Sequence, residues 1–300
     1  MKQTTKDKKI MKRILPNKTI LNSLSCPICS GNFSLKGVEL ERGSISLLCD
    51  GVRKHCYDLS SSGYVNFMPP GHSDGGDSKA AVRARTEFLN TDLYRPCADA
   101  LTEMLAKHLA PNDGLVLDAG CGEGYYTELL ARKGFSCLGF DLSRAAVDAA
   151  SKRMARADHD NGFFCVGSVF ELPVAENSCA AIVNIFAPCA ENEFLRALRS
   201  RGILLVAYAG PEHLMGLKRA IYNTTKENDG RADLPKQMKQ IDELRVRYSI
   251  SVKTEAQIQN LFAMTPYYWR TSPTDAEKLR GLNELDTEVD MIFSVYRKDE

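Results

Sequence analysis

The sequence lacks any apolar run long enough to cross a membrane. A spanning helix needs roughly 20 consecutive apolar residues, whereas the best candidate here, 203–209, has the length of a buried strand. The charged N-terminus is followed by no apolar segment of the kind that a secretory signal contains. Internal repeats are also missing. We therefore expect a cytoplasmic protein in a reducing compartment, whose ten cysteines serve as metal ligands or packing residues.

The chain also has almost no net charge, but its charges are unevenly placed. The formal value is +1 over 300 residues, with ordinary hydrophobic (44%) and charged (26%) fractions for a globular protein. Residues 1–20 hold seven basic residues and one acid, a net charge of +6, so the remainder carries −5. Since this segment lacks periodicity, we expect a flexible basic tail. Such a tail suits a polyanionic partner, and a solvated tail without a partner fits equally well.

Composition divides the chain into four parts. Residues 1–20 form the tail, 21–70 a small cysteine-bearing unit, 71–113 a linker with helices, and 114–300 the largest domain. The linker opens with GHSDGGDSKA, whose glycine, serine and aspartate content marks a loop or hinge. Because a parallel sheet has its own core, we expect a fragment that begins near Gly76 to fold alone.

Strand and helix patterns alternate from residue 114 onward, which is typical of an α/β fold with a parallel sheet covered on both faces. Two earlier helices are predicted to begin at Lys79 and near Pro96, since proline suits a first helical turn. The C-terminal part departs from the alternation. In chain order, the expected strands are 115–118, 137–141, 163–167, 180–185, 203–208, 245–252 and 289–296, and the expected helices are 125–132, 144–154, 193–198 and 256–264.

Three glycines alternate in VLDAGCGEGYYTELL, where the first of these strands passes into its helix. A dinucleotide loop follows G-x-G-x-x-G, but the sixth position counted from Gly120 is Tyr125. Here the pattern is instead D-x-G-x-G-x-G, from Asp118 to Gly124. The acidic Asp118 suits a cationic ligand and repels a pyrophosphate. The loop therefore favours a nucleoside that carries an amino acid.

An acid also ends the second predicted strand. Asp141 follows Gly120 by 21 residues, a position from which a carboxylate accepts hydrogen bonds from ribose hydroxyls. Together, the glycine loop and Asp141 resemble the class I S-adenosylmethionine-dependent methyltransferases. We therefore expect S-adenosylmethionine as the cofactor, with a dinucleotide as the alternative.

Four cysteines and a histidine lie close together near the N-terminus. CPIC places Cys26 and Cys29 on one knuckle, and CDGVRKHC follows with Cys49, His55 and Cys56. Zinc takes four nitrogen or sulfur ligands in a tetrahedron. A unit of this size builds little core, so metal binding would largely fold it. The alternative is a group of buried reduced cysteines without metal.

Eight segments share their pattern with one family. They resemble the 23S ribosomal RNA guanine-N1 methyltransferases, also called ribosomal RNA large subunit methyltransferase A. The resemblance spans residues 26–296 and is faint in 225–260. The segments are CPIC, HCYDLSSSGYVNF, GDSKAAVRARTEFL, LDAGCGEGYYT, FAPC, GPEHLMGLK, IYN and MTPYYWR.

The resemblance implies a fold and an activity. The fold is a Rossmann-like class I methyltransferase domain with a seven-stranded, mostly parallel sheet, whose last strand is antiparallel. A small N-terminal zinc-binding domain recognises RNA. The activity is methylation of guanine N1 in a hairpin of 23S ribosomal RNA. The alternatives are a methyltransferase that acts on a small molecule or another RNA, and a non-catalytic RNA-binding protein. The assembly state stays open, with a homodimer as one candidate.

The resemblance also implies roles for single residues. Because the family's last ligand pair is C-x3-H and this chain has two extra residues there, Cys56 competes with His55 as the fourth zinc ligand. The structural alternatives are a packing role for Tyr94 and a capping or surface position for His213. The implied zinc ligands are Cys26, Cys29, Cys49 and His55, and the cofactor residues are Tyr94, Asp118, Gly120, Cys121, Gly122, Glu123, Gly124, Asp141 and His213.

The strand end NIFAPC lies where class I enzymes contact the acceptor base. Asn184 and the backbone of Ala187 and Pro188 are the candidate contacts to the base edge. Pro188-Cys189 also matches the nucleophile of pyrimidine C5 methyltransferases, an alternative that the resemblance to guanine enzymes disfavours. Cationic side chains that could bind RNA phosphates are Arg83, Arg85 and Arg95. The sequence identifies no general base.

Overall fold

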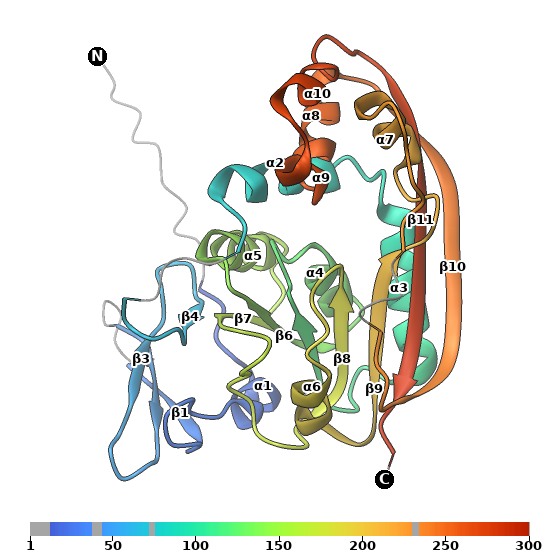
Figure 1. The fold of residues 1–300 in the computed structure, drawn as a ribbon. Helices are drawn as coiled ribbons and strands as arrows, with labels where there is room; N and C mark the ends of the chain where they lie inside the picture. Colours follow the sequence, from blue (N-terminus) through green and yellow to red (C-terminus); the bar gives the residue numbers. More distant parts are fainter. Residues whose placement is uncertain (1–12, 38–43, 72–75, 230–233, 300) are drawn as a thin grey trace, which may run out of the picture.

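The computed structural model describes residues 13–37, 44–71, 76–229 and 234–299. Its centre is an eight-stranded sheet with the order β10-β11-β9-β8-β5-β6-β7-β4 (Figure 1). Six neighbouring strands, from β9 to β4 in this order, are parallel, and β11 runs antiparallel between β9 and β10. The strands are β4 (Val65–Asn66), β5 (Leu115–Ala119), β6 (Ser136–Asp141), β7 (Gly162–Val166), β8 (Cys179–Ile185), β9 (Leu198–Ala209), β10 (Lys239–Val252) and β11 (Leu285–Arg297).

The Rossmann-like methyltransferase fold predicted from the sequence is confirmed, and the sheet has one strand more than expected. The extra strand is β4, which comes from the N-terminal unit and pairs in parallel with β7 at the edge. Strands β5, β7 and β8 are buried along their whole length. Such continuous apolar strands are typical of a parallel sheet that is covered on both faces.

Helices cover the sheet and form a further layer above it. Figure 1 shows α2 and α7 to α10 above the carboxyl ends of the parallel strands. Helices α2, α5 and α8 each begin after an N-cap, because Ser78, Ser143 and Thr254 each accept a hydrogen bond from a first-turn amide. The helices are α2 (Lys79–Leu89), α3 (Arg95–His108), α4 (Tyr125–Arg132), α5 (Arg144–Arg156), α6 (Glu191–Ala197), α7 (Met215–Ile221), α8 (Glu255–Ala263), α9 (Tyr267–Arg270) and α10 (Pro273–Glu277).

The N-terminal unit packs onto the sheet rather than standing apart. It contains α1 (Lys18–Ser23) and an antiparallel sheet of β1 (Phe33–Lys36), β2 (Ser46–Cys49) and β3 (Cys56–Asp58). Its residues share one hydrophobic cluster with β5 and β6, including Leu24, Leu117 and Phe140. Packing is therefore continuous across the boundary that the sequence suggests at residue 70, while a functional division there stays a prediction.

The predicted flexible tail is corrected in its last part. Residues 1–12 lie outside the described residues, but residues 13–20 are placed and Ile20 is fully buried. Helix α1 begins inside the predicted tail because the Asn17 side chain accepts a hydrogen bond from the amide of Ile20 at 3.0 Å. Among the described residues, no helix has both the length and the apolar character that a membrane span needs.

Candidate cofactor and metal sites

The glycine loop between β5 and α4 needs glycine at three positions. Gly120, Gly122 and Gly124 have φ angles of 87°, 54° and 78°, in the left-handed region that favours glycine. A Cβ atom at Gly120 would lie 2.5 Å from the Cβ of Ala187, and one at Gly124 would lie 2.8 Å from the Cβ of Ala150. The loop therefore brings its backbone close to both α5 and the segment that follows β8.

Asp141 holds this loop from the end of β6. One carboxylate oxygen, Oδ2, accepts a hydrogen bond from the amide of Gly122 at 3.0 Å, and Oδ1 accepts one from Ser143 at 2.8 Å. Burial raises the pKa of Asp141, and the two amides together with Arg85 oppose that rise. A carboxylate oxygen can accept a second bond, so the position still suits ribose hydroxyls.

Asp118 lies at the end of β5 beneath the loop and is 2% exposed. Its Oδ2 accepts a hydrogen bond from the hydroxyl of Thr127 at 2.6 Å. Its Oδ1 has no hydrogen-bond partner within the described part of the chain. Burial raises the pKa of Asp118 to about 7. The contact of this carboxylate with a cationic amine of the ligand, which the sequence suggests, stays a prediction.

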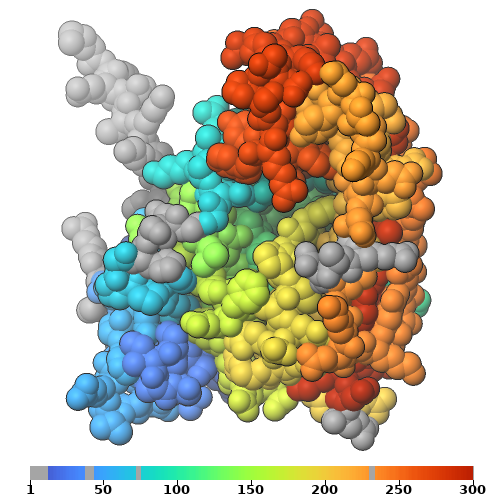
Figure 2. All heavy atoms as spheres, viewed as in Figure 1, coloured from blue at the N-terminus to red at the C-terminus, as the bar shows by residue number. Residues whose placement is uncertain are grey.

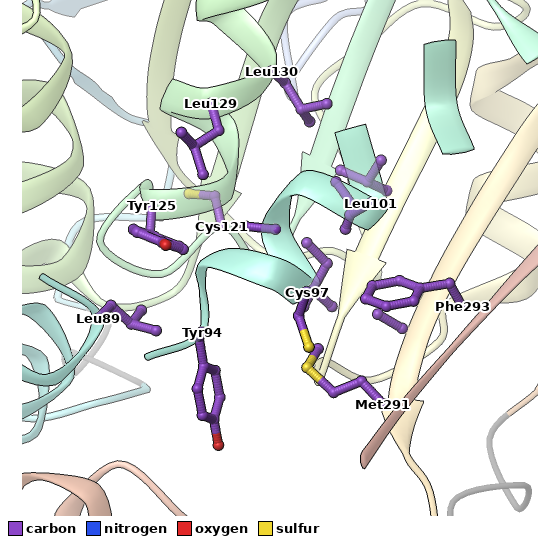
Figure 3. Packing of buried hydrophobic residues seen from close by; sticks show 14 of the residues in the cluster. Leu89, Tyr94, Cys97, Leu101, Cys121, Tyr125, Leu129, Leu130, Met291 and Phe293 are labelled. Atoms are coloured by element: carbon purple, nitrogen blue, oxygen red, sulfur yellow. The ribbon is translucent and has the colours of Figure 1, made fainter. Parts of the chain in front are cut away.

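The side chains of Glu123 and Cys121 are engaged within the protein, although both residues lie in the predicted cofactor loop. The Glu123 carboxylate pairs with Arg153 at 3.2 Å and accepts the amide of Tyr125. A role for Glu123 in cofactor binding therefore falls to its backbone. Figure 3 shows Cys121 beside Tyr125 and Leu129 in the hydrophobic cluster. Burial raises the pKa of the Cys121 thiol well above its ordinary value, so this side chain is a packing group.

Tyr94 and His213, the two cofactor residues implied by the resemblance, lie in contact with each other, while their contact with a cofactor stays a prediction. The Tyr94 hydroxyl oxygen lies 3.4 Å from His213 Nε2, and both residues are buried. His213 Nδ1 accepts the amide hydrogen of Asp290 at 3.2 Å, so Nε2 carries the proton and donates to Tyr94. Burial lowers the pKa of His213 to about 4, which keeps the ring neutral at neutral pH.

One residue beside this pair was missed by sequence reasoning. Phe186 stacks on the imidazole of His213 with ring centroids 5.6 Å apart and an interplanar angle of 28°. It lies within the FAPC motif, but nothing in the motif indicates its partner. Its side chain stays 50% exposed.

The candidate acceptor residues lie next to the glycine loop. The Asn184 side-chain nitrogen donates to the carbonyls of Ala119 and Pro188, at 3.1 and 3.2 Å. Asn184 thus ties the end of β5 to the loop after β8, and both hydrogens of its amide are used. Ala187 contacts Gly120 as described above. A contact of these residues with a base stays a prediction.

The three candidate phosphate-binding arginines each have their own acidic partner. Arg85 pairs with Asp77 at 2.6 Å and approaches the glycine loop at Gly122. Arg83 pairs with Glu87 on the exposed side of α2, and Arg95 pairs with Asp99. Of the three, Arg85 is placed beside the predicted cofactor position. RNA binding by Arg83 and Arg85 stays a prediction.

Four predicted metal ligands converge in the N-terminal unit. The ligand atoms of Cys26, Cys29, Cys49 and His55 all lie within 4.8 Å of one another. The three sulfurs lie 3.4–3.5 Å from His55 Nδ1. Tetrahedral zinc with bonds of about 2.3 Å separates its ligands by a similar distance. The donor set and spacing fit zinc, and Cys56 stands outside this group.

Comparisons with known proteins agree with the resemblance. A methyltransferase-domain family model matches residues 116–202. A Streptomyces fradiae protein named 23S rRNA (guanine(748)-N(1))-methyltransferase is 27% identical over 93% of this chain and 98% of its own length. Proteins of Micromonospora griseorubida and Bacillus subtilis, provisionally named as 23S rRNA guanine-N1 methyltransferases, are 29% and 26% identical. They align over 85% and 89% of this chain, and 89% and 94% of their own lengths. The predicted resemblance is therefore confirmed.

Proposed function

We propose that this protein transfers the methyl group of S-adenosylmethionine to N1 of a guanine in a 23S ribosomal RNA hairpin. The observation that carries the proposal is the loop of three left-handed glycines held by Asp141 above Asp118. The names of relatives that align over most of the chain supply the substrate class. This chain's own residues then explain how such a reaction is organised.

The cofactor would lie along the glycine loop, with its ribose at Asp141 and its amine at Asp118. S-adenosylmethionine supplies a methyl group on a sulfonium, which leaves by in-line displacement. Such a transfer depends mainly on positioning, because reacting atoms held at about 3–3.5 Å react far faster than free ones. The ties from Asn184 to both loops fix the acceptor loop relative to the glycine loop.

The acceptor would be an unpaired guanine. Its N1 lies on the Watson–Crick edge, so an enzyme needs a looped-out or unstacked base. Figure 2 shows a hollow between the orange-red helices α8 to α10 and the yellow-green ends of the parallel strands, where such a base would enter. In this proposal, the zinc-bearing unit and the basic N-terminal segment hold the RNA.

The test is methylation of RNA by the purified protein. We expect label from methyl-labelled S-adenosylmethionine to enter unmodified 23S rRNA and to appear as 1-methylguanosine after nucleoside digestion. Because N1 methylation blocks base pairing, primer extension should stop beside the modified position. The Asp141→Ala variant is the control for contaminating activity. A different methylated nucleoside would contradict guanine N1 as the target.

The alternatives give different results in the same experiment. Cofactor binding without any RNA labelling favours a small-molecule methyltransferase. RNA binding without cofactor binding in titration calorimetry favours a non-catalytic RNA-binding protein. Primer extension on rRNA from a deletion strain identifies the guanine, since the stop should disappear there.

A further inference from the structure

Phe186 has an unusual backbone and an exposed ring. It follows β8 directly, and its φ angle of 51° lies in the left-handed region. A bulky residue in this region is strained, and such strain persists where the surroundings impose it. Here the Phe186 amide donates to the carbonyl of Ala207 at 3.0 Å, which fixes the turn. The turn directs a large apolar side chain toward solvent rather than into the core.

The two sides of the Phe186 ring have different surroundings. One face stacks on His213, which is 6% exposed and tied to Tyr94 and to the amide of Asp290. The imidazole is neutral at neutral pH, because burial lowers its pKa to about 4. With half of its surface exposed, the Phe186 ring is supported on one side and accessible on the other.

The position of Phe186 relates this accessible face to the methyl donor. The next residue, Ala187, lies against Gly120, the first glycine of the cofactor loop. The chain from Asn184 to Pro188 is also tied to the end of β5. A planar ligand stacked on Phe186 would therefore lie beside the glycine loop, where the methyl group is presented.

We propose that Phe186 forms the stacking surface for the acceptor base, so that the base, Phe186 and His213 make a three-ring stack. This inference rests on the proposed function, since it assigns the recognition of the base within the same site. Aromatic rings accept the π-face of any base. Stacking therefore holds the plane of the base, and the backbone of Ala187 and Pro188 is left to contact its edge.

Three variants at this position test the proposal. Phe186→Ala removes the ring, Phe186→Leu keeps an apolar side chain without a π-face, and Phe186→Tyr keeps the ring. With a 23S rRNA hairpin as substrate, we expect kcat/KM to fall about 5- to 150-fold in the Ala variant. The Leu variant should fall similarly, while the Tyr variant should stay near the parent. The affinity for S-adenosylhomocysteine, measured by calorimetry, should be the same in all four proteins.

Each contrary result has a distinct meaning. A Leu variant with the parent's kcat/KM would overturn the proposal, because an apolar side chain would then suffice. Loss of S-adenosylhomocysteine binding in the Ala and Leu variants would also overturn it, since Phe186 would then shape the cofactor pocket. If the parent protein itself methylates no RNA, the proposed function fails before the variants are compared.

Discussion

Replacement of Asp141 by alanine tests how the cofactor loop is held. The carboxylate joins two segments, because Oδ2 accepts the amide of Gly122 and Oδ1 accepts the amide of Ser143. The variant loses both bonds and any contact with the ribose. Gly122 then keeps its left-handed conformation without its side-chain acceptor. We expect weaker cofactor binding in a protein that still folds, since the core beneath the loop is unchanged.

The size of the effect follows from these contacts. A hydrogen bond to a charged group contributes about 1.5–3 kcal/mol, so the loss of the ribose contact should weaken binding roughly 10- to 150-fold. The two hydrogen bonds that the amides of Gly122 and Ser143 donate to Asp141 are also lost, and each contributes a similar free energy before desolvation is counted. Burial raises the pKa of Asp141, however, and this desolvation offsets part of their contribution. We expect the free energy of unfolding to fall by about 1–3 kcal/mol.

The assay is titration calorimetry with S-adenosylmethionine, together with urea unfolding. Ser143→Ala is the matched control, because it removes the N-cap of α5 and the bond to the carbonyl of Asp77 but keeps the amide that Asp141 accepts. It should cost about 1 kcal/mol of stability and leave cofactor affinity unchanged. An Asp141→Ala variant that binds as tightly as the parent would refute the reasoning. Equal weakening in both variants would show that general destabilisation is the cause.

Three further predictions concern the metal cluster and the two buried titratable groups. The purified protein should carry about one zinc; Cys49→Ser should lose it and Cys56→Ser should keep it in metal analysis, and zinc-free protein purified without chelators would contradict this. In cofactor-free protein, the folded pKa of Asp118 is about 7, above its ordinary 3.8, so its ionisation destabilises the fold as pH rises through that window. Asp118→Asn should therefore be more stable relative to the parent at pH 8 than at pH 4, by at most about 4 kcal/mol in urea unfolding; a difference that does not change with pH would contradict the raised pKa. His213 acts oppositely, because its folded pKa of about 4 lies below the ordinary 6.5, and stability is lost as pH falls between these values. His213→Asn should remove up to about 3 kcal/mol of that acid-induced loss of stability in urea unfolding. A variant that loses as much stability as the parent between pH 6.5 and pH 4 would contradict the lowered pKa.

Much of the central fold could be predicted because its elements carry strong local signals. The pattern of 125–132 predicts α4 at its observed bounds, and the strand patterns of 137–141 and 180–185 each miss one residue. The edge strand β10 begins six residues before the predicted 245. The prediction missed this first part because it is largely exposed and has no apolar alternation. Strand β4 has two residues, too few for any periodicity.

The candidate site also contains some features that local sequence patterns predict and others that depend on the tertiary fold. The glycine loop and Asp141 are local patterns, and their geometry matches what the spacing requires. The stack of Phe186 on His213 joins residues 27 positions apart through the strand order, which no local pattern encodes. The ion pair of Glu123 with Arg153 could not be predicted from the sequence either, since it depends on how α5 lies beside the loop. The sequence therefore predicts the local shape of the glycine loop, whereas contacts between distant segments depend on the fold.

The shared core links the metal unit to the cofactor loop. Cys26 and Cys49 belong to the same hydrophobic cluster as Leu117 and Ala119, the residues of β5 that lead into the glycine loop. Removal of residues 1–75 would strip β4 from β7 and expose apolar surface at about 25 cal/mol per Å². This packing works against independent folding of a fragment that begins at Gly76. Metal binding that orders the N-terminal unit should therefore also stabilise the sheet that carries the cofactor residues.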